Sequence, residues 1–168
     1  MKIKTLLTLW LLFFCATSLF AQSKYDKGLA KAEASYKIGD YASARKNLEK
    51  IRKKIAAKLG AQNQYTAGIY LSLAKYDLAS GMPLDFEYNL QNSLTSSKTL
   101  NGENSEKYGT LLIDAAELYN QNGSYRVAKE YLTNAKKTLD AGGFFKDPVK
   151  ARWDLVMSET LAGPGILQ

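Results

Sequence analysis

The chain has 168 residues, no histidine, one cysteine and a formal net charge of +7. This length corresponds to about one domain. The lack of histidine excludes the commonest general base, histidine metal ligands and serine–histidine nucleophile systems. Neither a phosphate-binding loop nor a dinucleotide-binding glycine motif occurs in the sequence. The composition therefore favours binding over catalysis, and we expect no enzyme activity, no cofactor and no metal.

The N-terminal segment has the pattern of a secretory signal. Lys2 and Lys4 precede an apolar run from Leu6 to Phe20, and Ala21 is a small residue suited to cleavage. We predict a signal peptide over residues 1–21 and export to the periplasm or cell envelope, or secretion. A retained transmembrane anchor is less favoured because a span needs about 20 apolar residues. A lipid anchor on Cys15 is less favoured because the residue before it is not small.

Positive charge is concentrated near the start of the predicted mature chain. Residues 24–60 carry 11 basic and 4 acidic side chains, and residues 61–168 carry 10 and 12. The pattern has two interpretations: a patch that binds an anionic surface, or a solvated helix face. Because export is predicted, nucleic acid is not an expected partner. The basic patch consists of Arg45, Lys46, Lys50, Lys53, Lys54 and Lys58.

A period of 42 residues runs through the sequence. Gly39, Gly81 and Gly123 are 42 residues apart, and a fixed period of that size is typical of stacked helical repeats. The same spacing relates further sets of residues: Ala32, Ala74 and Ala116; Ala44, Phe86 and Ala128; Leu48, Leu90 and Leu132. We expect the alanines to let paired helices approach to about 8 Å, and each glycine to form the bend between two helices.

The predicted elements follow in chain order as amphipathic helices. We expect an all-α solenoid of stacked antiparallel helix pairs within a domain over residues 22–168. Its three units cover about 24–60, 61–101 and 104–142, and a half-unit helix covers 147–162, which gives seven helices in all.

Two places depart from the repeat. In the middle unit Pro83 suits the first position of a helix, and Phe86 is expected to fill the space that a tyrosine occupies near the bends of the other units. Asp147 is predicted to cap the last helix with Pro148 at its first position. On that helix Trp153 and its apolar neighbours would leave apolar surface exposed if the helix were a cap.

The strings AEASYKIGDYASA (residues 32–44) and AAELYNQNGSYRVA (residues 115–128) resemble tetratricopeptide repeats (TPRs). The period of 42 is longer than the usual 34 or so and is similar to that of kinesin light chain repeats. The stretch TLNGENSEKYGTLLIDAAELY also resembles that subtype, without its frequent His-Pro. The resemblance covers about residues 24–162 and implies a concave groove lined by the first helix of each unit.

The resemblance implies a protein-binding groove with an apolar floor and a mostly acidic rail. The groove residues carried over by position are Leu29, Glu33, Tyr36, Lys37, Leu71, Lys75, Leu78, Ile113, Glu117, Asn120 and Gln121. Such a groove suits an extended peptide or a helix that carries basic groups. The alternative is that the apolar row packs against neighbouring helices and that the charged row is solvated.

Three hypotheses for the function stay open on the sequence. The first is an exported scaffold or adaptor that binds another protein or a peptide in the groove. The second is an interaction or regulatory part of a longer enzyme or sensor whose catalytic domain is absent. The third is attachment of the basic patch to an anionic envelope surface.

Overall fold

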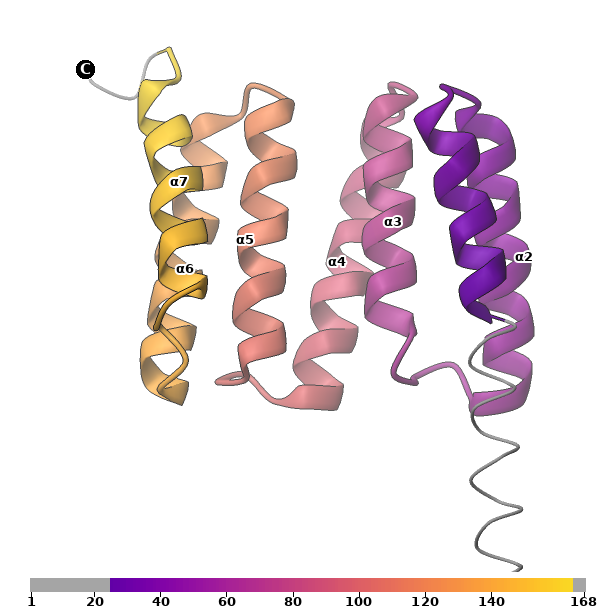
Figure 1. The fold of residues 1–168 in the computed structure, drawn as a ribbon, viewed down its shortest axis with the longest axis horizontal. Coiled ribbons are helices and arrows are strands. Elements are labelled where there is room, and N and C mark those ends of the chain that lie inside the picture. The colour runs from indigo at the N-terminus through magenta and orange to yellow at the C-terminus, as the bar shows by residue number, and fades with distance from the viewer. Residues whose placement is uncertain (1–24, 165–168) are drawn as a thin grey trace, which may run out of the picture. The chain divides into compact units, whose positions relative to one another are not determined.

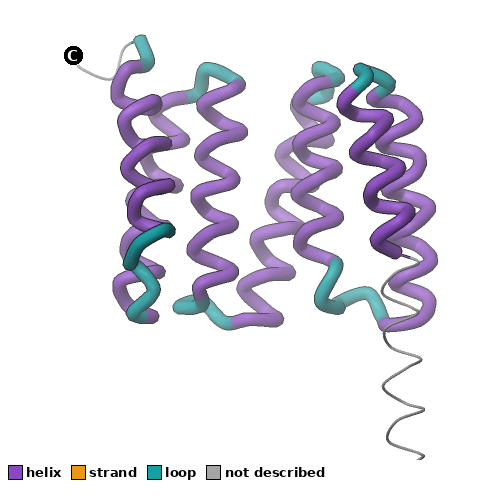
Figure 2. The backbone as a smooth tube through the Cα atoms, viewed as in Figure 1, coloured by secondary structure: helices purple, strands orange, loops and turns teal. Residues whose placement is uncertain are grey.

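The computed structural model describes residues 25–164 and folds them into helices joined by turns, with no strand in this range (Figures 1 and 2). The predicted all-α class is confirmed, whereas the predicted signal peptide and Cys15 lie outside the described residues. None of the described helices is both long and apolar enough to cross a membrane. The helices comprise a first helix over residues 25–37, then α2 (Tyr41–Leu59), α3 (Thr66–Ala79), α4 (Pro83–Asn101), α5 (Glu106–Gln121), α6 (Tyr125–Gly142) and α7 (Val149–Ala162).

The described residues form two compact units, one ending at Lys58 and the other beginning at Leu59. The first unit contains the first helix and α2. In the second unit α3 packs against antiparallel α4, α5 packs against α6, and α7 packs against both α5 and α6 (Figure 1). Sequential antiparallel pairing of this kind is the arrangement of a TPR-like solenoid.

The three periodic glycines lie at the bends inside the helix pairs, as predicted. Gly39, Gly81 and Gly123 have φ angles of +81°, +70° and +74°, a region that L-residues with a side chain rarely adopt. At each bend the residue after the glycine donates its N–H to a carbonyl five residues back; the N···O distances are 3.0, 2.9 and 2.8 Å. This pattern is the Schellman motif, which ends a helix with a left-handed glycine.

The periodic small residues are buried where helices meet. Ala32, Ala74 and Ala116 have no exposed surface, and neither do Ala44 and Ala128. Interiors are packed as densely as organic crystals, so a larger side chain at these positions has no free volume to enter. The common phase of the repeat in the sequence therefore corresponds to a common packing register.

The middle repeat, over about residues 61–101, forms the expected helix pair but makes different contacts near its bend. The helix α4 begins at Pro83, as predicted, with the proline in the first turn. Phe86 is buried, and its ring packs edge-on against Tyr119 of α5, with 5.4 Å between the ring centroids. In the first unit a tyrosine pair covers the bend, with the rings of Tyr36 and Tyr41 5.4 Å apart.

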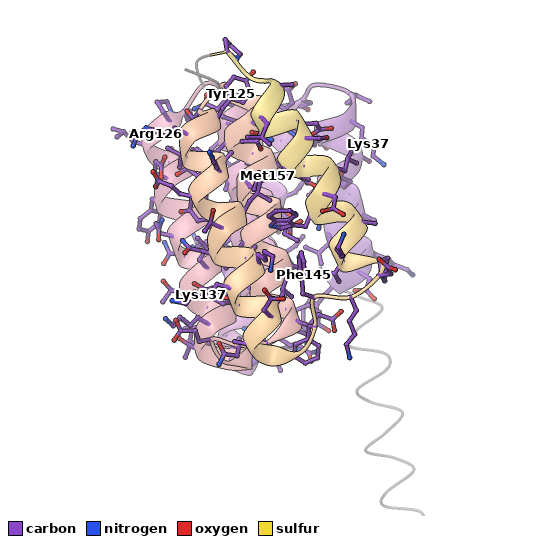
Figure 3. The ribbon with its side chains drawn as sticks, turned by 90° about the vertical axis from the view of Figure 1, so that its left-hand side faces the viewer. Lys37, Tyr125, Arg126, Lys137, Phe145 and Met157 are labelled. Carbon is purple, nitrogen blue, oxygen red and sulfur yellow. The ribbon has the colours of Figure 1, made fainter. Side chains whose placement is uncertain are left out.

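The last helix differs from the prediction at its start. It begins at Val149, and Pro148 takes the cap position without any side-chain hydrogen bond, so Asp147 is not the cap. The apolar residues named on this helix are buried or half-buried. Val156 is buried, and Trp153, Met157 and the preceding Phe145 pack against the core. Met157 and Phe145 lie between α7 and α6 (Figure 3).

Trp153 holds α7 against α6 by a polar contact as well. Its indole Nε1–H donates to the backbone carbonyl of Leu132 at 2.7 Å, and its ring meets Phe145 edge-on at 5.7 Å. A buried indole needs such a partner to offset its desolvation. The large apolar side chain that α7 does expose is Leu155, with 59% of its surface accessible.

Candidate functional site

A pocket of about 410 Å³ lies between the first helices of two neighbouring pairs, α3 and α5, and it is closed on one side by the last turns of α4. The apolar part of its wall comes from Ala67 and Leu71 of α3, Leu100 of α4 and Leu111 of α5. Pockets of about 300–1,000 Å³ with an apolar lining and a few polar groups are typical ligand sites. The remaining lining residues are Gln64, Gly68, Ser97, Asn101, Lys107 and Asp114.

The polar groups of this pocket offer both donors and acceptors. The side-chain amide of Asn101 donates to the carbonyl of Ser97 at 3.1 Å, which leaves its amide oxygen able to accept a hydrogen bond. Lys107 is exposed, and no described residue forms an ion pair with it. The pocket thus combines an apolar floor with an amide rim and one available positive charge.

Asp114, the acidic residue of the pocket lining, is already paired with a cation. Arg152 of α7 reaches Asp114 Oδ1 with its Nη2 at 2.6 Å and Glu117 Oε1 with its Nε at 3.0 Å. Burial alone would lower the pKa of Arg152, but the hydrogen bonds and charges of the two carboxylates outweigh it and raise that pKa. The guanidinium fork is suited to such a pair of carboxylates. This cluster therefore orients α7 against α5 and is not a free acidic surface.

Two predicted groove residues on α5 belong to this helix contact, and a third is buried. Ile113 has no exposed surface. Asn120 donates its amide to Thr160 Oγ1 of α7 at 2.9 Å, and Glu117 is paired with Arg152. The physical reason is that α7 packs directly against α5 and pairs with the polar side chains on that face. Gln121, the fourth predicted residue on α5, is exposed.

The predicted groove residues on α3 divide between core and pocket. Leu71, Lys75 and Leu78 are all half-buried. Leu71 and Leu78 pack against the core, and Leu71 also lines the pocket. Leu71 is therefore the predicted floor residue that the pocket contains.

The remaining predicted groove residues belong to the first helix, in the unit that ends at Lys58. Leu29, Glu33 and Tyr36 are half-buried and Lys37 is exposed. Burial raises the pKa of the Tyr36 hydroxyl, and the Tyr36 ring packs against Tyr41 at the bend. A continuous groove from this helix into the second unit stays a prediction.

The predicted basic patch forms a face of α2. Lys46, Lys50 and Lys53 follow each other at steps of four and three, the spacing of one helix face, and all three are exposed, as are Lys54 and Lys58. Arg45 differs, since it is half-buried and has an interaction partner.

Sequence reasoning missed most of the pocket. The repeat period does not relate the lining residues Ala67, Leu111 and Lys107 to one another. The positions that face each other across α3 and α5 are not equivalent positions in the repeat. Leu100 and Asn101 are on the second helix of the pair, which the resemblance does not assign to the groove. A helical step back from Leu71 reaches Ala67, and that is the signal in the sequence that could have identified it.

No metal site accompanies these features within residues 25–164, where no group of three or more acidic or cysteine side chains is arranged to hold an ion. No buried side-chain nitrogen or oxygen in that range lacks a hydrogen-bond partner. A ligand would therefore have to use exposed or half-buried polar groups of this range.

Comparison with known proteins gives one partial similarity. The chain is 39% identical over 72 residues to Protein KINESIN LIGHT CHAIN-RELATED 3 of Arabidopsis thaliana, a match that covers 43% of this chain and 10% of that protein. No protein-family model matches the chain, and no solved structure matches it. The similarity is distant and partial, and it agrees with the TPR-like pairing of the helices.

Proposed function

We propose that this chain is a protein-interaction domain that binds a segment of another polypeptide in the pocket between α3 and α5. The observation that carries the proposal is the apolar floor formed by Leu71, Leu100 and Leu111, with amide groups of Gln64 and Asn101 at its rim. An apolar side chain of a guest peptide fills the floor, and the amides hydrogen-bond its backbone. The TPR-like fold and the partial similarity to a kinesin light chain-related protein support a protein partner in general.

The charged side chains at the pocket restrict which peptides are expected to bind. Arg152 pairs with both Asp114 and Glu117, so one positive charge offsets part of the two negative charges beside the pocket. Lys107 is the charge without an ionic partner among the described lining residues. The preferred guest is therefore an extended segment with one large apolar residue beside an acidic residue.

Selection from a library of displayed peptides tests this proposal. We expect selected peptides to bind the chain with micromolar affinity and to lose at least about tenfold in affinity, about 1.4 kcal/mol, when Leu71 is replaced by glutamate. Leu84→Glu is the matched control, because Leu84 is an 85% exposed leucine of α4 outside the pocket. Equal binding by a folded Leu71→Glu variant, or peptides weakened only by Leu84→Glu, would refute the assignment.

The basic face of α2 supports a second candidate function, contact with an anionic surface. Five exposed lysines on one helix give an electrostatic attraction that salt screens, with a Debye length of about 8 Å at 0.15 M. Binding to vesicles that contain anionic lipid is expected to fall as salt rises, and to fall again when Lys46, Lys50 and Lys53 become glutamine. Binding that does not respond to salt would exclude this function.

Export is part of the proposal. Its support is the sequence pattern of residues 1–21. Expression of the full chain followed by N-terminal sequencing of the product tests it, with a new terminus near Gln22 expected and an intact Met1 in the cytosolic fraction as the contrary result.

A further inference from the structure

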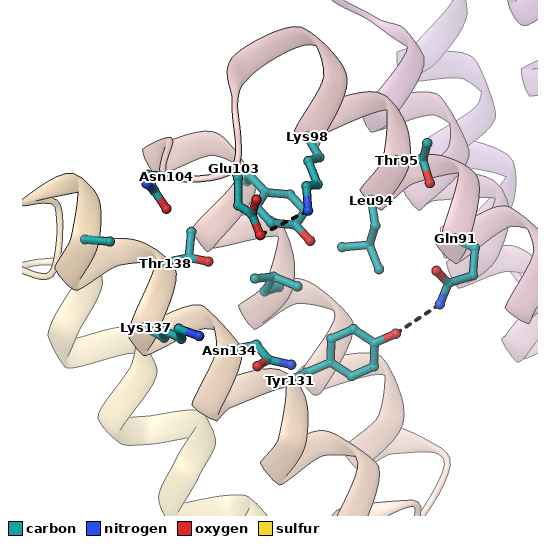
Figure 4. Close-up of a pocket in the computed structure, with 13 residues that line it drawn as sticks. Gln91, Leu94, Thr95, Lys98, Glu103, Asn104, Tyr131, Asn134, Lys137 and Thr138 are labelled. Carbon is teal, nitrogen blue, oxygen red and sulfur yellow. Dashed lines mark hydrogen bonds and ion pairs between the residues drawn. The ribbon is translucent and has the colours of Figure 1, made fainter.

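A second pocket, also of about 410 Å³, lies on the other side of the last turns of α4, between α4, α5 and α6 (Figure 4). It shares no residue with the pocket between α3 and α5. Its floor is apolar and aromatic, with Leu94 of α4, Tyr108 and Leu112 of α5, and Tyr131 of α6. Its volume lies in the range of small-molecule sites, about 300–1,000 Å³.

Neutral polar groups form the walls of this pocket. Thr95 of α4 and Asn134 and Thr138 of α6 line it, and Asn104 lies at the end next to the α4–α5 turn (Figure 4). Amides and hydroxyls can both donate and accept, so together they match a ligand that presents hydroxyl groups around a ring.

The positive charges of the pocket are not equivalent. Lys98 is held by Glu103, with 3.0 Å between Nζ and Oε1, and this hydrogen bond raises the pKa of Lys98. Lys137, on the opposite wall, has no ion-pair or hydrogen-bond partner among the described residues. The three charged lining residues therefore leave one unpaired positive charge beside the polar wall.

The tyrosine at the edge of the floor is fixed in place. Tyr131 stacks on Tyr119 with 5.3 Å between ring centroids and an interplanar angle of 17°, and its hydroxyl accepts from Gln91 Nε2 at 3.2 Å. A ring held on one face and at its hydroxyl presents a preorganised surface to a ligand, which lowers the entropy cost of binding.

We infer that this pocket binds an anionic sugar, with the sugar ring on the tyrosine floor, its hydroxyls bonded to the amide and threonine walls, and its carboxylate or phosphate at Lys137. This inference is independent of peptide binding between α3 and α5. The shared chemistry is one anionic group on a polyhydroxylated ring, and the ligand series below separates the carboxylate from the phosphate form.

Titration of the ¹⁵N-labelled chain with methyl glucuronide, glucose 6-phosphate, methyl glucoside, acetate and inorganic phosphate tests the inference by NMR. We expect shifts of the side-chain amides of Asn104 and Asn134 with methyl glucuronide or glucose 6-phosphate. Methyl glucoside is expected to bind about fivefold more weakly, since one exposed ion pair contributes up to about that factor. Acetate and phosphate are expected to give no saturable shift, because they do not use the floor.

Two lysine variants provide the matched comparison. Lys137→Met is expected to weaken the anionic sugar about fivefold and to leave methyl glucoside unchanged. Lys129→Met, an exposed lysine of the same helix that does not line the pocket, is expected to change neither. Three results would overturn the inference. The first is that acetate or phosphate binds as well as the sugars. The others are shifts located away from Asn104 and Asn134, and equal effects of the two lysine variants.

Discussion

Replacing a bend glycine tests the physical basis of the repeat, and Gly81→Ala is the clearest case. Gly81 has φ +70°, and a Cβ built there meets no atom within 4 Å. The cost is therefore conformational: about 1–2 kcal/mol for a left-handed residue with a side chain, reduced by about 0.4–1 kcal/mol because alanine restricts the unfolded chain. The net loss in free energy of unfolding is about 1 kcal/mol.

The matched control is Gly68→Ala in the helix that leads to the same bend. Its Cβ also meets nothing within 4 Å, and its φ is not positive. Alanine is the better helix former, so this variant is expected to stabilise the chain by about 0.5–1 kcal/mol. Urea unfolding followed by circular dichroism measures both. If the two variants shifted the free energy of unfolding in the same direction by similar amounts, the assignment of Gly81 to a left-handed bend would be refuted.

Three other predictions concern packing and charge. Burial raises the pKa of the Tyr119 hydroxyl, and so do its hydrogen bonds to Glu87. The protonated hydroxyl therefore contributes its full stabilisation below about pH 10, and this stabilisation is lost as the pH rises through the folded-state pKa. Above pH 10 the free energy of unfolding of the Tyr119→Phe variant should therefore fall less steeply with pH than that of the original chain, by up to about 1.4 kcal/mol per pH unit. Equal pH dependence of the two, measured by urea unfolding at several pH values, would contradict this. Arg152→Met removes both ion pairs to α5 and should cost about 1 kcal/mol because the pairs are partly exposed. Hydrogen exchange should then rise in α7 alone, and a uniform rise over all helices would be the contrary result. Ala116→Leu places bulk between buried helices and should cost about 1–3 kcal/mol, whereas Ala151→Leu at an exposed position of α7 should change the melting temperature little; similar effects would refute the close approach.

The helices and their bends were predictable because they depend on local rules. A left-handed bend needs glycine, and a close helix contact needs alanine, so both leave a fixed residue type at a fixed spacing. The glycine rule is the one that predicted the bends at Gly39, Gly81 and Gly123. The start of α7 was mispredicted by a residue because Asp147–Pro148 satisfies a capping rule that the structure does not use.

The site was less predictable because it depends on which faces remain open after packing. The repeat register groups Leu71 with Ile113, yet Ile113 is fully buried whereas Leu71 lines a pocket. Arg152 was not among the predicted site residues, although it pairs with Asp114 of the pocket lining. A single sequence shows neither the crossing angle of α3 and α5 nor the reach of a side chain from a third helix.

The most direct measurement of the central claim is the map of amide shifts when a selected peptide saturates the ¹⁵N-labelled chain. The pocket between α3 and α5 predicts shifts that centre on Ala67, Leu71 and Leu111 and that are absent from the exposed face of α2. Shifts centred on α2, or confined to the α4–α6 side, would contradict it.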